Sequence, residues 1–524
     1  VFKAPVLEHH EYMNWRYGEI EFDSDVSLSE ADFELSVWVV HYPFDTKHAT
    51  TFSSSSVALD RVFRLTQNSV KYLALDMYSD SNARQRSNSC QADATTACQA
   101  QFATTNDLAM PRLMTEMIMD FSHLPGDSSW PYPPPTNPIN GTGGYVSSRW
   151  ADWTVLPAIN VCNDALFSGD LTLAKRHLHA LVKYHLYIDV LDRATGLVID
   201  KTPTCTNAKP NTCLTCLIDT SGGSDDGFVQ SPANSVVQAW VYYGLHRVSQ
   251  LARWINEKDT ADDLDSKAAT LKDSFNKLMV SHTDNVSNTM EVCDGLCADT
   301  SHTSIHSSFY ALAFDLVNTS YKPAVVRYVQ ARVEASAVGF PGGAYPIQFL
   351  LLALFNDETD KGHFGTKVLT SSKNHSWIAM MDVHHATTTM ECWSPEELPN
   401  LSFSHIWSAS PSFIIPWFVA GVTPVTPGFG EISIKPQPGP LTRLLMTMPT
   451  VRGPVAVDVS QTFDDVTQDL VHFQVTAQIP GNTKVVMYVP RTTCVELDGR
   501  RIQEHTRGVS GYQISEQGAH VFVS

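Results

Sequence analysis

Two polar segments of the chain contain carboxylates, imidazoles and aromatic rings in a pattern that suggests a reactive site. Residues 80–93 read Asp-Ser-Asn-Ala-Arg-Gln-Arg-Ser-Asn-Ser-Cys-Gln-Ala-Asp, and residues 384–407 contain Glu391, Trp393 and His405. Carboxylates beside aromatic rings can hold a sugar by hydrogen bonds and stacking, and a pair of carboxyl groups can hydrolyse a glycosidic bond. A carboxylate taken alone is more often a solvated surface group. Together, the two segments indicate a candidate carbohydrate site.

A third group of residues could add an aromatic surface to such a site. Trp150 and Trp153 lie three positions apart in the sequence Trp-Ala-Asp-Trp. On a helix this spacing puts both rings on one face, where a pyranose ring could stack. Two tryptophans at helical spacing are about as often part of a hydrophobic core. The pattern therefore leaves both interpretations open.

Most of the secondary structure around these residues is expected to be helical. From about Ser56 to Gly421 the apolar residues follow a helical period, as in the stripe begun by Leu59, Val62 and Phe63. About ten to twelve helices are expected in this region. No period of ~30 to 45 residues recurs, which argues against a solenoid and favours a closed toroid. Further stripes are expected near residues 104–120, 151–167, 178–186, 232–254, 262–280, 304–317, 322–335, 343–355 and 407–420.

Strand patterns flank the helical region on both sides. Residues 1–52 alternate between apolar and polar positions and read as the last strands of an incomplete β-sandwich. After the helical region, which we take as residues 53–424, residues 425–524 contain Val-rich alternating segments separated by Pro, Gly and Asp. We expect these segments near residues 431–435, 455–459, 471–475 and 485–489. The last region is therefore predicted to be a small β-domain.

Composition and charge exclude several classes of function. Of the 524 residues, 43% are hydrophobic and 17% charged, which rules out a disordered chain. No apolar run reaches the ~20 residues that a membrane-spanning helix needs. The formal net charge of −19 would repel nucleic acid. A globular protein without a nucleic-acid partner or a membrane span is expected.

Cysteines and glycosylation sequons point to an extracellular compartment. The chain has ten cysteines, several of them close together, such as Cys293 and Cys297, and disulfides are favoured over a zinc cluster because no histidine lies at ligand spacing. Since Val1 opens without a signal segment, we expect a mature product or a piece of a longer precursor. Asn-x-Ser/Thr sequons, candidate glycosylation sites, occur at Asn140, Asn285, Asn318, Asn374 and Asn400.

The first polar segment resembles a signature loop of the inverting α-L-rhamnosidases of glycoside hydrolase family 78. That loop has an Asp, an Arg about four residues later, a Glu that acts as general acid just after it, and a further Asp. Asp80, Arg84 and Asp93 match this order, with one residue extra before Asp93. Gln85 stands where the family has its general acid.

The second polar segment resembles another loop of the same family. The family pattern is Ala-Thr-Thr, a variable residue, usually a Trp, a Glu that acts as general base, and a Trp two positions on. Residues 386–393 fit this spacing, with Met390 in place of the usual Trp before Glu391. His405 resembles the histidine that follows the base, and the stretch from Trp150 to Trp153 resembles a Trp-rich barrel loop.

This resemblance covers most of the chain and implies both fold and function. The implied fold is a multidomain α+β protein, with an (α/α)6 helical barrel between an N-terminal β-sandwich remnant and a C-terminal β-sandwich. The implied activity is inverting hydrolysis of a terminal rhamnose-type sugar in a glycan, without a cofactor or metal. Glu391 would be the base. The implied sugar-binding residues are Asp80, Arg84, Asp93, Trp150, Trp153, Trp393 and His405.

The departure at Gln85 leaves the activity open. An amide cannot protonate a glycosidic oxygen, and positioned proton transfer typically contributes ~10²- to 10⁴-fold in rate. One outcome is a weakened or inactive hydrolase. A second is a non-catalytic carbohydrate-binding or structural protein, in association with other extracellular chains. A third is a rhamnose-uronate lyase, in which Arg84 or Arg86 would neutralise the uronate carboxylate.

Overall fold

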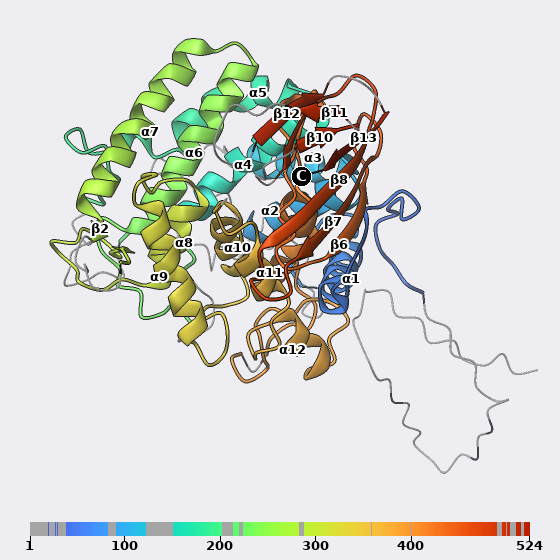
Figure 1. Cartoon of the computed structure of the whole chain (residues 1–524). Helices are drawn as coiled ribbons and strands as arrows, with labels where there is room; N and C mark the ends of the chain where they lie inside the picture. Colours follow the sequence, from blue (N-terminus) through green and yellow to red (C-terminus); the bar gives the residue numbers. More distant parts are fainter. Residues whose placement is uncertain are drawn as a thin grey trace, which may run out of the picture.

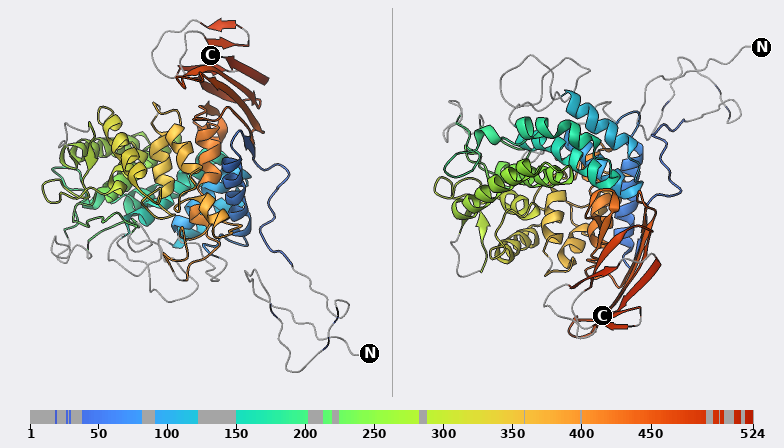
Figure 2. Two further views of the ribbon diagram at one scale, coloured as in Figure 1. Left: turned by 60° about the horizontal axis from the view of Figure 1, so that its bottom comes forward. Right: turned by 90° about the horizontal axis from the view of Figure 1, so that it is seen from above.

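The computed structural model describes most of the chain between residues 38 and 523. The described residues are 19, 27, 29, 38–81, 91–121, 150–201, 213–218, 224–281, 288–357, 359–398, 400–489, 495–498, 500–502, 510–514 and 518–523. Most of the predicted N-terminal β-sandwich segment, Arg84, Gln85 and the sequons at Asn140 and Asn285 lie outside these residues. The helices form one body, and the C-terminal strands stand against the side where helix α1 (Val57–Tyr72) lies (Figures 1 and 2).

Within the described residues, six helices make a closed inner ring. Each packs on the next in chain order, and the last one packs on the first. This closure confirms the toroid and, with it, the predicted (α/α)6 barrel. The inner helices are α2 (Gln91–Thr104), α4 (Ala151–Ser168), α6 (Ser235–Trp254), α8 (Ile305–Ala313), α10 (Ile347–Phe355) and α13 (Pro411–Ile414), which continues into the π-helix η7 (Ile415–Val419).

The remaining helices lie outside this ring, most of them next to an inner helix that they precede or follow, whereas α12 contacts α1 (Figure 1). The outer segment between two inner helices brings the chain back, so consecutive inner helices start from the same end of the toroid. The outer helices are α1 (Val57–Tyr72), α3 (Ala109–Phe121), α5 (Thr172–Ala180) with the π-helix η3 (Leu181–His185), α7 (Lys258–Leu278), α9 (Lys322–Ala335), α11 (His363–Leu369) and α12 (Trp377–Asp382). Short 3₁₀ turns are η4 (Ile188–Val190), η6 (Ile406–Ser408) and η8 (Pro427–Phe429).

Local sequence explains where the helices begin and which face they bury. The side chain of Ser56 accepts a hydrogen bond from the backbone of Leu59 and so caps α1. Asn234 caps α6 in the same way, through the backbone N–H groups of Val236 and Val237. The stripe of α1 that the sequence predicts is buried in the barrel wall. Outer helices are amphipathic because one face meets solvent.

The sequence did not predict helix α2, and its burial explains why. Its side chains from Ala92 to Thr104 are almost all buried, in a sequence made largely of Ala, Thr and Gln. An inner helix packs on the ring neighbours, the outer layer and the barrel core at once, so it has no solvent-facing side to create a helical period. The period-based expectation therefore placed a helix only near residues 104–120, where α3 lies.

The C-terminal region folds as two facing β-sheets, which confirms the predicted β-sandwich. One sheet has the strand order β1-β6-β7-β8-β13-β10-β11 and the other β12-β9-β5-β4. Alternate residues of β7, beginning with Val455, Val457 and Val459, are buried, as expected for strands with one face toward a core. The bounds are β4 (Val422–Pro424), β5 (Glu431–Ile434), β6 (Arg443–Met448), β7 (Val455–Phe463), β8 (Leu470–Ile479), β9 (Lys484–Val489), β10 (Val495–Leu497), β11 (Arg500–Ile502), β12 (Ser510–Ile514) and β13 (Gly518–Val523).

Two features tie this sandwich to the barrel. Strand β1 (Thr51–Ser54), just before α1, pairs antiparallel with β6, with Phe52 opposite Met446. At the junction after η7, Gly421 has φ +81°, and a Cβ there would lie 2.1 Å from the carbonyl carbon of Lys435. Only glycine fits both the left-handed backbone and this close approach. The barrel and the sandwich are thus joined at both ends of the helical region.

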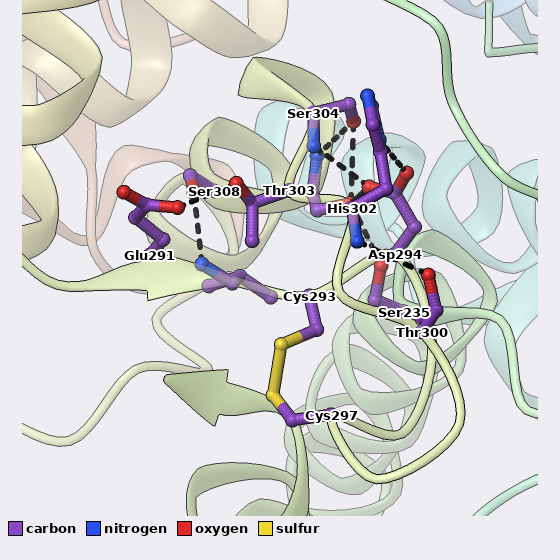
Figure 3. Close-up of a disulfide and its surroundings, with 12 residues drawn as sticks. Ser235, Glu291, Cys293, Asp294, Cys297, Thr300, His302, Thr303, Ser304 and Ser308 are labelled. Atoms are coloured by element: carbon purple, nitrogen blue, oxygen red, sulfur yellow. Dashed lines mark hydrogen bonds and ion pairs between the residues drawn. A yellow bond between two sulfur atoms is a disulfide. The ribbon is translucent and has the colours of Figure 1, made fainter. Parts of the chain in front are cut away.

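One disulfide lies in the loop that leads into α8. Cys293 and Cys297 are bonded, next to the short hairpin β2 (Val280–Ser281) and β3 (Glu291–Val292) (Figure 3). The bond confirms the expected disulfide chemistry for this pair and removes it from the zinc alternative. Cys213 is also disulfide-bonded. Four further buried cysteines are not in disulfides: Cys98, Cys162, Cys216 and Cys392.

The buried carboxylate of Asp294 fixes the same loop. It accepts a hydrogen bond from the backbone N–H of Ser304 at 2.8 Å and lies 2.5 Å from Nδ1 of His302 (Figure 3). It also accepts hydrogen bonds from the backbone N–H of Val229 at 2.8 Å and from the hydroxyl of Ser307 at 2.7 Å. Buried charged acceptors with several donors are strongly held. This network anchors the loops that precede α6 and α8.

No helix in the described ranges is both long and apolar enough to cross a bilayer.

Candidate active site

The candidate site residues gather at the end of the toroid where the inner helices begin. Asp93 lies in the first turn of α2, Asp152 in the first turn of α4, and Tyr345 just before α10. Because the inner helices start from one end, residues far apart in the sequence share that end. Helix N-termini also present partial positive charge, which favours carboxylates there. The topology thus builds a carboxylate-rich mouth from separate segments.

The two polar segments meet at this mouth. The backbone N–H of Ile406 donates to the carbonyl oxygen of Asp80 at 3.3 Å. Nδ1 of His405 lies 3.3 Å from Oδ1 of Asp93, and both side chains are buried. A backbone link and a side-chain link therefore join segments that lie more than 300 residues apart in the sequence. The structure brings together Asp80, Asp93, Glu391 and His405.

Glu391 is held by its own loop. Its carboxylate oxygen Oε2 accepts a hydrogen bond from the backbone N–H of Ser402 at 2.8 Å, and its N–H donates to the Ser402 carbonyl at 2.9 Å. The indole N–H of Trp407 donates to the carbonyl oxygen of Glu391 at 2.8 Å. The side chain is only 5% exposed. A carboxylate fixed this way keeps one orientation, which is what a general base requires.

A buried threonine connects this loop to the barrel wall. Both the N–H and the hydroxyl of Thr389 lie within hydrogen-bond distance of the Ser69 hydroxyl of α1, at 2.8 and 2.9 Å. The Thr389 hydroxyl also donates to the carbonyl oxygen of His405 at 2.6 Å, and the His405 N–H donates back to the Thr389 carbonyl at 2.8 Å. Hydrogen bonds therefore link the segments before and after Glu391 to α1.

A row of rings connects the acidic residues across the mouth. The rings of His405 and Trp407 lie 4.2 Å apart, and those of Trp407 and Tyr345 lie 5.6 Å apart. Burial raises the pKa of Tyr345 well above its usual range, and the charges of Asp152 and Asp93 raise it further. Tyr345 is therefore near both carboxylates. The sequence reasoning missed Tyr345, although the Gly-Gly turn before it marks a tight loop ahead of a helix.

Asp152 is a further acidic residue that the sequence reasoning missed. It is fully buried, and its Oδ2 accepts a hydrogen bond from the backbone N–H of Leu217 at 3.2 Å. Burial raises the pKa of this carboxyl to about 7, against the smaller opposing effect of backbone hydrogen bonds from Leu217 and Trp153. Its position between two tryptophans already noted was the signal that could have found it.

The raised pKa of Asp152 predicts a pH-dependent stability. The unfolded carboxyl has a pKa of about 3.9, so between about pH 4 and 7 the folded state holds a proton that the unfolded state has lost. Asp152 therefore lowers the free energy of unfolding as the pH rises through this window, by up to ~4 kcal/mol. We expect Asp152→Asn to remove this decline, measured by urea unfolding from pH 4.5 to 8.

The control for this prediction is Asp273→Asn, which alters an exposed aspartate of α7. Asp273→Asn should leave the pH dependence of the unfolding free energy unchanged. If the free energy of unfolding of Asp152→Asn falls with pH as steeply as that of the wild type, the decline cannot be assigned to Asp152.

The predicted aromatic residues take different places. The rings of Trp150 and Trp153 lie 4.7 Å apart at the start of α4, with Trp150 partly exposed and Trp153 buried. Trp393 is fully buried, donates from its indole to the carbonyl oxygen of Gly342 at 2.8 Å, and stacks on His375. In the described structure Trp393 is therefore a core residue that stabilises the Glu391 loop.

The remaining predicted residues are only partly covered by the structure. Arg84 and Gln85 lie outside the described residues, as do Asn140 and Asn285. Among the other sequons, Asn374 and Asn400 are exposed and Asn318 is partly exposed. The described part of the mouth holds four carboxyl groups, an imidazole and several rings, a set suited to binding hydroxyl groups and activating water.

Comparison with protein families assigns nearly the whole described chain. Residues 47–422 match the bacterial alpha-L-rhamnosidase six-hairpin glycosidase domain. Residues 421–502 match the bacterial alpha-L-rhamnosidase C-terminal domain. The two matched regions meet at Gly421, the junction between barrel and sandwich. A search of curated proteins finds no match.

Solved structures with the same fold include three α-L-rhamnosidases. The enzyme from Streptomyces avermitilis, complexed with L-rhamnose, aligns with a TM-score of 0.69 at 17% identity, over 92% of this chain and 42% of that one. Those from Dictyoglumus thermophilum and Aspergillus terreus align with TM-scores of 0.68 and 0.67, each at 16% identity over 91% of this chain and 50% of theirs.

These alignments agree on architecture and differ in extent. This chain spans half or less of the length of each of the three enzymes. At such identities the likeness shows the shared fold, while the family match covers most of the chain, from residue 47 to residue 502. The chain belongs to the α-L-rhamnosidase family that is defined by the six-hairpin glycosidase domain.

Proposed function

We propose that the protein is a secreted, inverting glycoside hydrolase of the α-L-rhamnosidase type that acts on terminal rhamnose-type sugars of glycans. The observation that carries the proposal is the meeting of Glu391, Asp93 and His405 at one mouth of the barrel. The three similar structures are α-L-rhamnosidases, one of them complexed with L-rhamnose, which supports the same sugar class here.

In this proposal Glu391 is the general base. Its carboxylate removes a proton from a water molecule while the oxygen of that water attacks the anomeric carbon, and the bond to the leaving oxygen breaks on the opposite face. Asp80, Asp93 and His405, with Arg84, hold the sugar hydroxyls. Trp150 and Trp153 supply an aromatic wall. The attack from the opposite face inverts the anomeric centre.

Departure of the leaving group is the weak step. Gln85 occupies the position that the family gives to its acid, and an amide has no proton to transfer at neutral pH. An aryl leaving group can depart as an aryloxide without protonation, whereas a sugar alkoxide needs the proton. We therefore propose that the enzyme is weak on natural glycosides and better on activated ones.

The same residue favours a second candidate function. A chain that kept the sugar-binding mouth but lost its acid would serve as a carbohydrate-binding or structural extracellular protein. The disulfide between Cys293 and Cys297 and the exposed sequons Asn374 and Asn400 support secretion in either case. Turnover of an activated substrate distinguishes the two candidates.

The stereochemistry of the product tests the proposal. The protein is incubated with an aryl α-L-rhamnoside and the reaction is followed by proton NMR from the first minutes. We expect β-L-rhamnose to appear first and the α anomer to follow only by mutarotation. If α-L-rhamnose appears first, the inverting mechanism is wrong. If rhamnose binds but no aryl rhamnoside is hydrolysed, the non-catalytic candidate is favoured.

A further inference from the structure

A cavity of about 320 Å³ lies at the opposite end of the toroid from the candidate active site. Its walls come from the last residues of inner helices, including Phe355 of α10 and Trp417 and Phe418 of η7. The smaller sheet of the C-terminal sandwich closes it with Thr423 and Ser433. The volume is at the lower end of the ~300 to 1,000 Å³ typical of small-molecule sites.

Two side chains that line this cavity each keep one buried polar atom that no other group in the described residues satisfies. One is the indole Nε1 of Trp417, and the other is Oε1 of Gln437. Gln437 is 6% exposed, and its amide nitrogen already donates to the carbonyl oxygen of Phe355 at 2.9 Å. Buried polar groups without partners are uncommon in folded proteins, so each calls for an explanation.

The chemistry of the two atoms specifies what would complete them. An indole N–H can only donate, and an amide oxygen can only accept. A hydroxyl group can do both. A ligand with several hydroxyl groups could therefore satisfy Trp417 and Gln437 together, after a small adjustment of these side chains.

The rest of the lining fits a sugar ring. Phe418 stacks on Phe355, with ring centroids 5.9 Å apart, which leaves an apolar wall against which the C–H face of a pyranose can pack. Thr423 and Ser433 add hydroxyl groups at the sheet side. Trp417 lies in a π-helical turn, a geometry often found at functional sites.

The charged groups at the cavity leave a net positive charge. Lys322 and Lys272 both contact the carboxylate of Asp315, and Lys435 also lines the cavity, so the lysines outnumber the carboxylate.

We propose that this cavity is a second carbohydrate-binding site, built at the junction of barrel and sandwich, for hydroxyl-rich pyranose units. Its position away from the mouth with Glu391 makes it a docking point for a glycan and not a part of the hydrolytic site. The argument rests on the lining of this cavity and does not depend on the proposed hydrolysis.

The experiment follows the indole N–H signal of Trp417 in the full-length protein. With ¹⁵N-labelled tryptophan, Trp417→Phe identifies the signal by its loss, and Trp254→Phe, which changes a tryptophan of α6 outside the cavity, should remove a different signal. Titration with L-rhamnose and with D-galactose should move the Trp417 signal saturably, with a Kd of about 1 to 10 mM. Glycine betaine, which has no hydroxyl group, should not move it.

Variants of the lining give the second measurement. Gln437→Leu should abolish the saturable shift, and the milder Ser433→Ala should weaken binding several-fold while the other indole signals stay in place. A Trp417 signal that does not respond to either sugar, or that responds equally to glycine betaine, would overturn the proposal and leave a water-filled cavity. Because the experiment measures a local NMR signal and not turnover, its result does not depend on whether the protein hydrolyses a substrate.

Discussion

Replacing Glu391 with glutamine is expected to lower kcat/KM for an aryl α-L-rhamnoside by ~10²- to 10⁴-fold. The amide keeps the size of the side chain and can still accept the hydrogen bond that the Ser402 N–H gives to Oε2. It cannot take a proton from water. The loss should therefore fall on kcat, with KM for the rhamnoside little changed, because the groups proposed to hold the sugar remain.

The matched control is Glu396→Gln, an exposed carboxylate five residues further along the same loop. It should keep wild-type kcat/KM. Initial rates of aryl release, together with thermal unfolding of both variants, make the comparison. A Glu391→Gln protein that hydrolyses the substrate at the wild-type rate would remove Glu391 from the base role.

Restoring a carboxyl group at position 85 is expected to have the opposite effect. For a natural rhamnosyl glycan, whose leaving group is a poor one, Gln85→Glu should raise kcat/KM by ~10²- to 10⁴-fold, since it supplies the missing proton donor. For an aryl rhamnoside with a good leaving group the gain should be small. The ratio of the kcat/KM values for the two substrates therefore reports on proton donation and not on folding.

The pH profile and one control variant sharpen this test. Gln85→Glu should show a basic limb in kcat/KM that the wild type lacks, since only the protonated acid is active. Gln85→Asn keeps an amide at this position and should gain nothing. Equal gains in the Asn and Glu variants, or no gain on the natural glycan, would show that Gln85 does not occupy the acid position.

Much of the scaffold could be predicted because its information is local. Amphipathic outer helices such as α1 and α7 reveal themselves by period, since one face meets solvent and the other meets the barrel. The alternation in β7 and β9 likewise follows from one buried face per strand. Helix α2 was missed because it is buried on all sides, and no local period records that environment.

Residue types and their order are enough to identify the candidate reactive side chains: Glu391, Asp80, Asp93 and His405 lie in two polar segments whose order matches a known family. The folded chain was needed to show that Nδ1 of His405 lies beside Asp93, that Trp393 is buried in the core, and that Asp152 is buried with a raised pKa. Residue type and spacing are local properties, whereas distance and dielectric surroundings exist only once the ring of inner helices has closed.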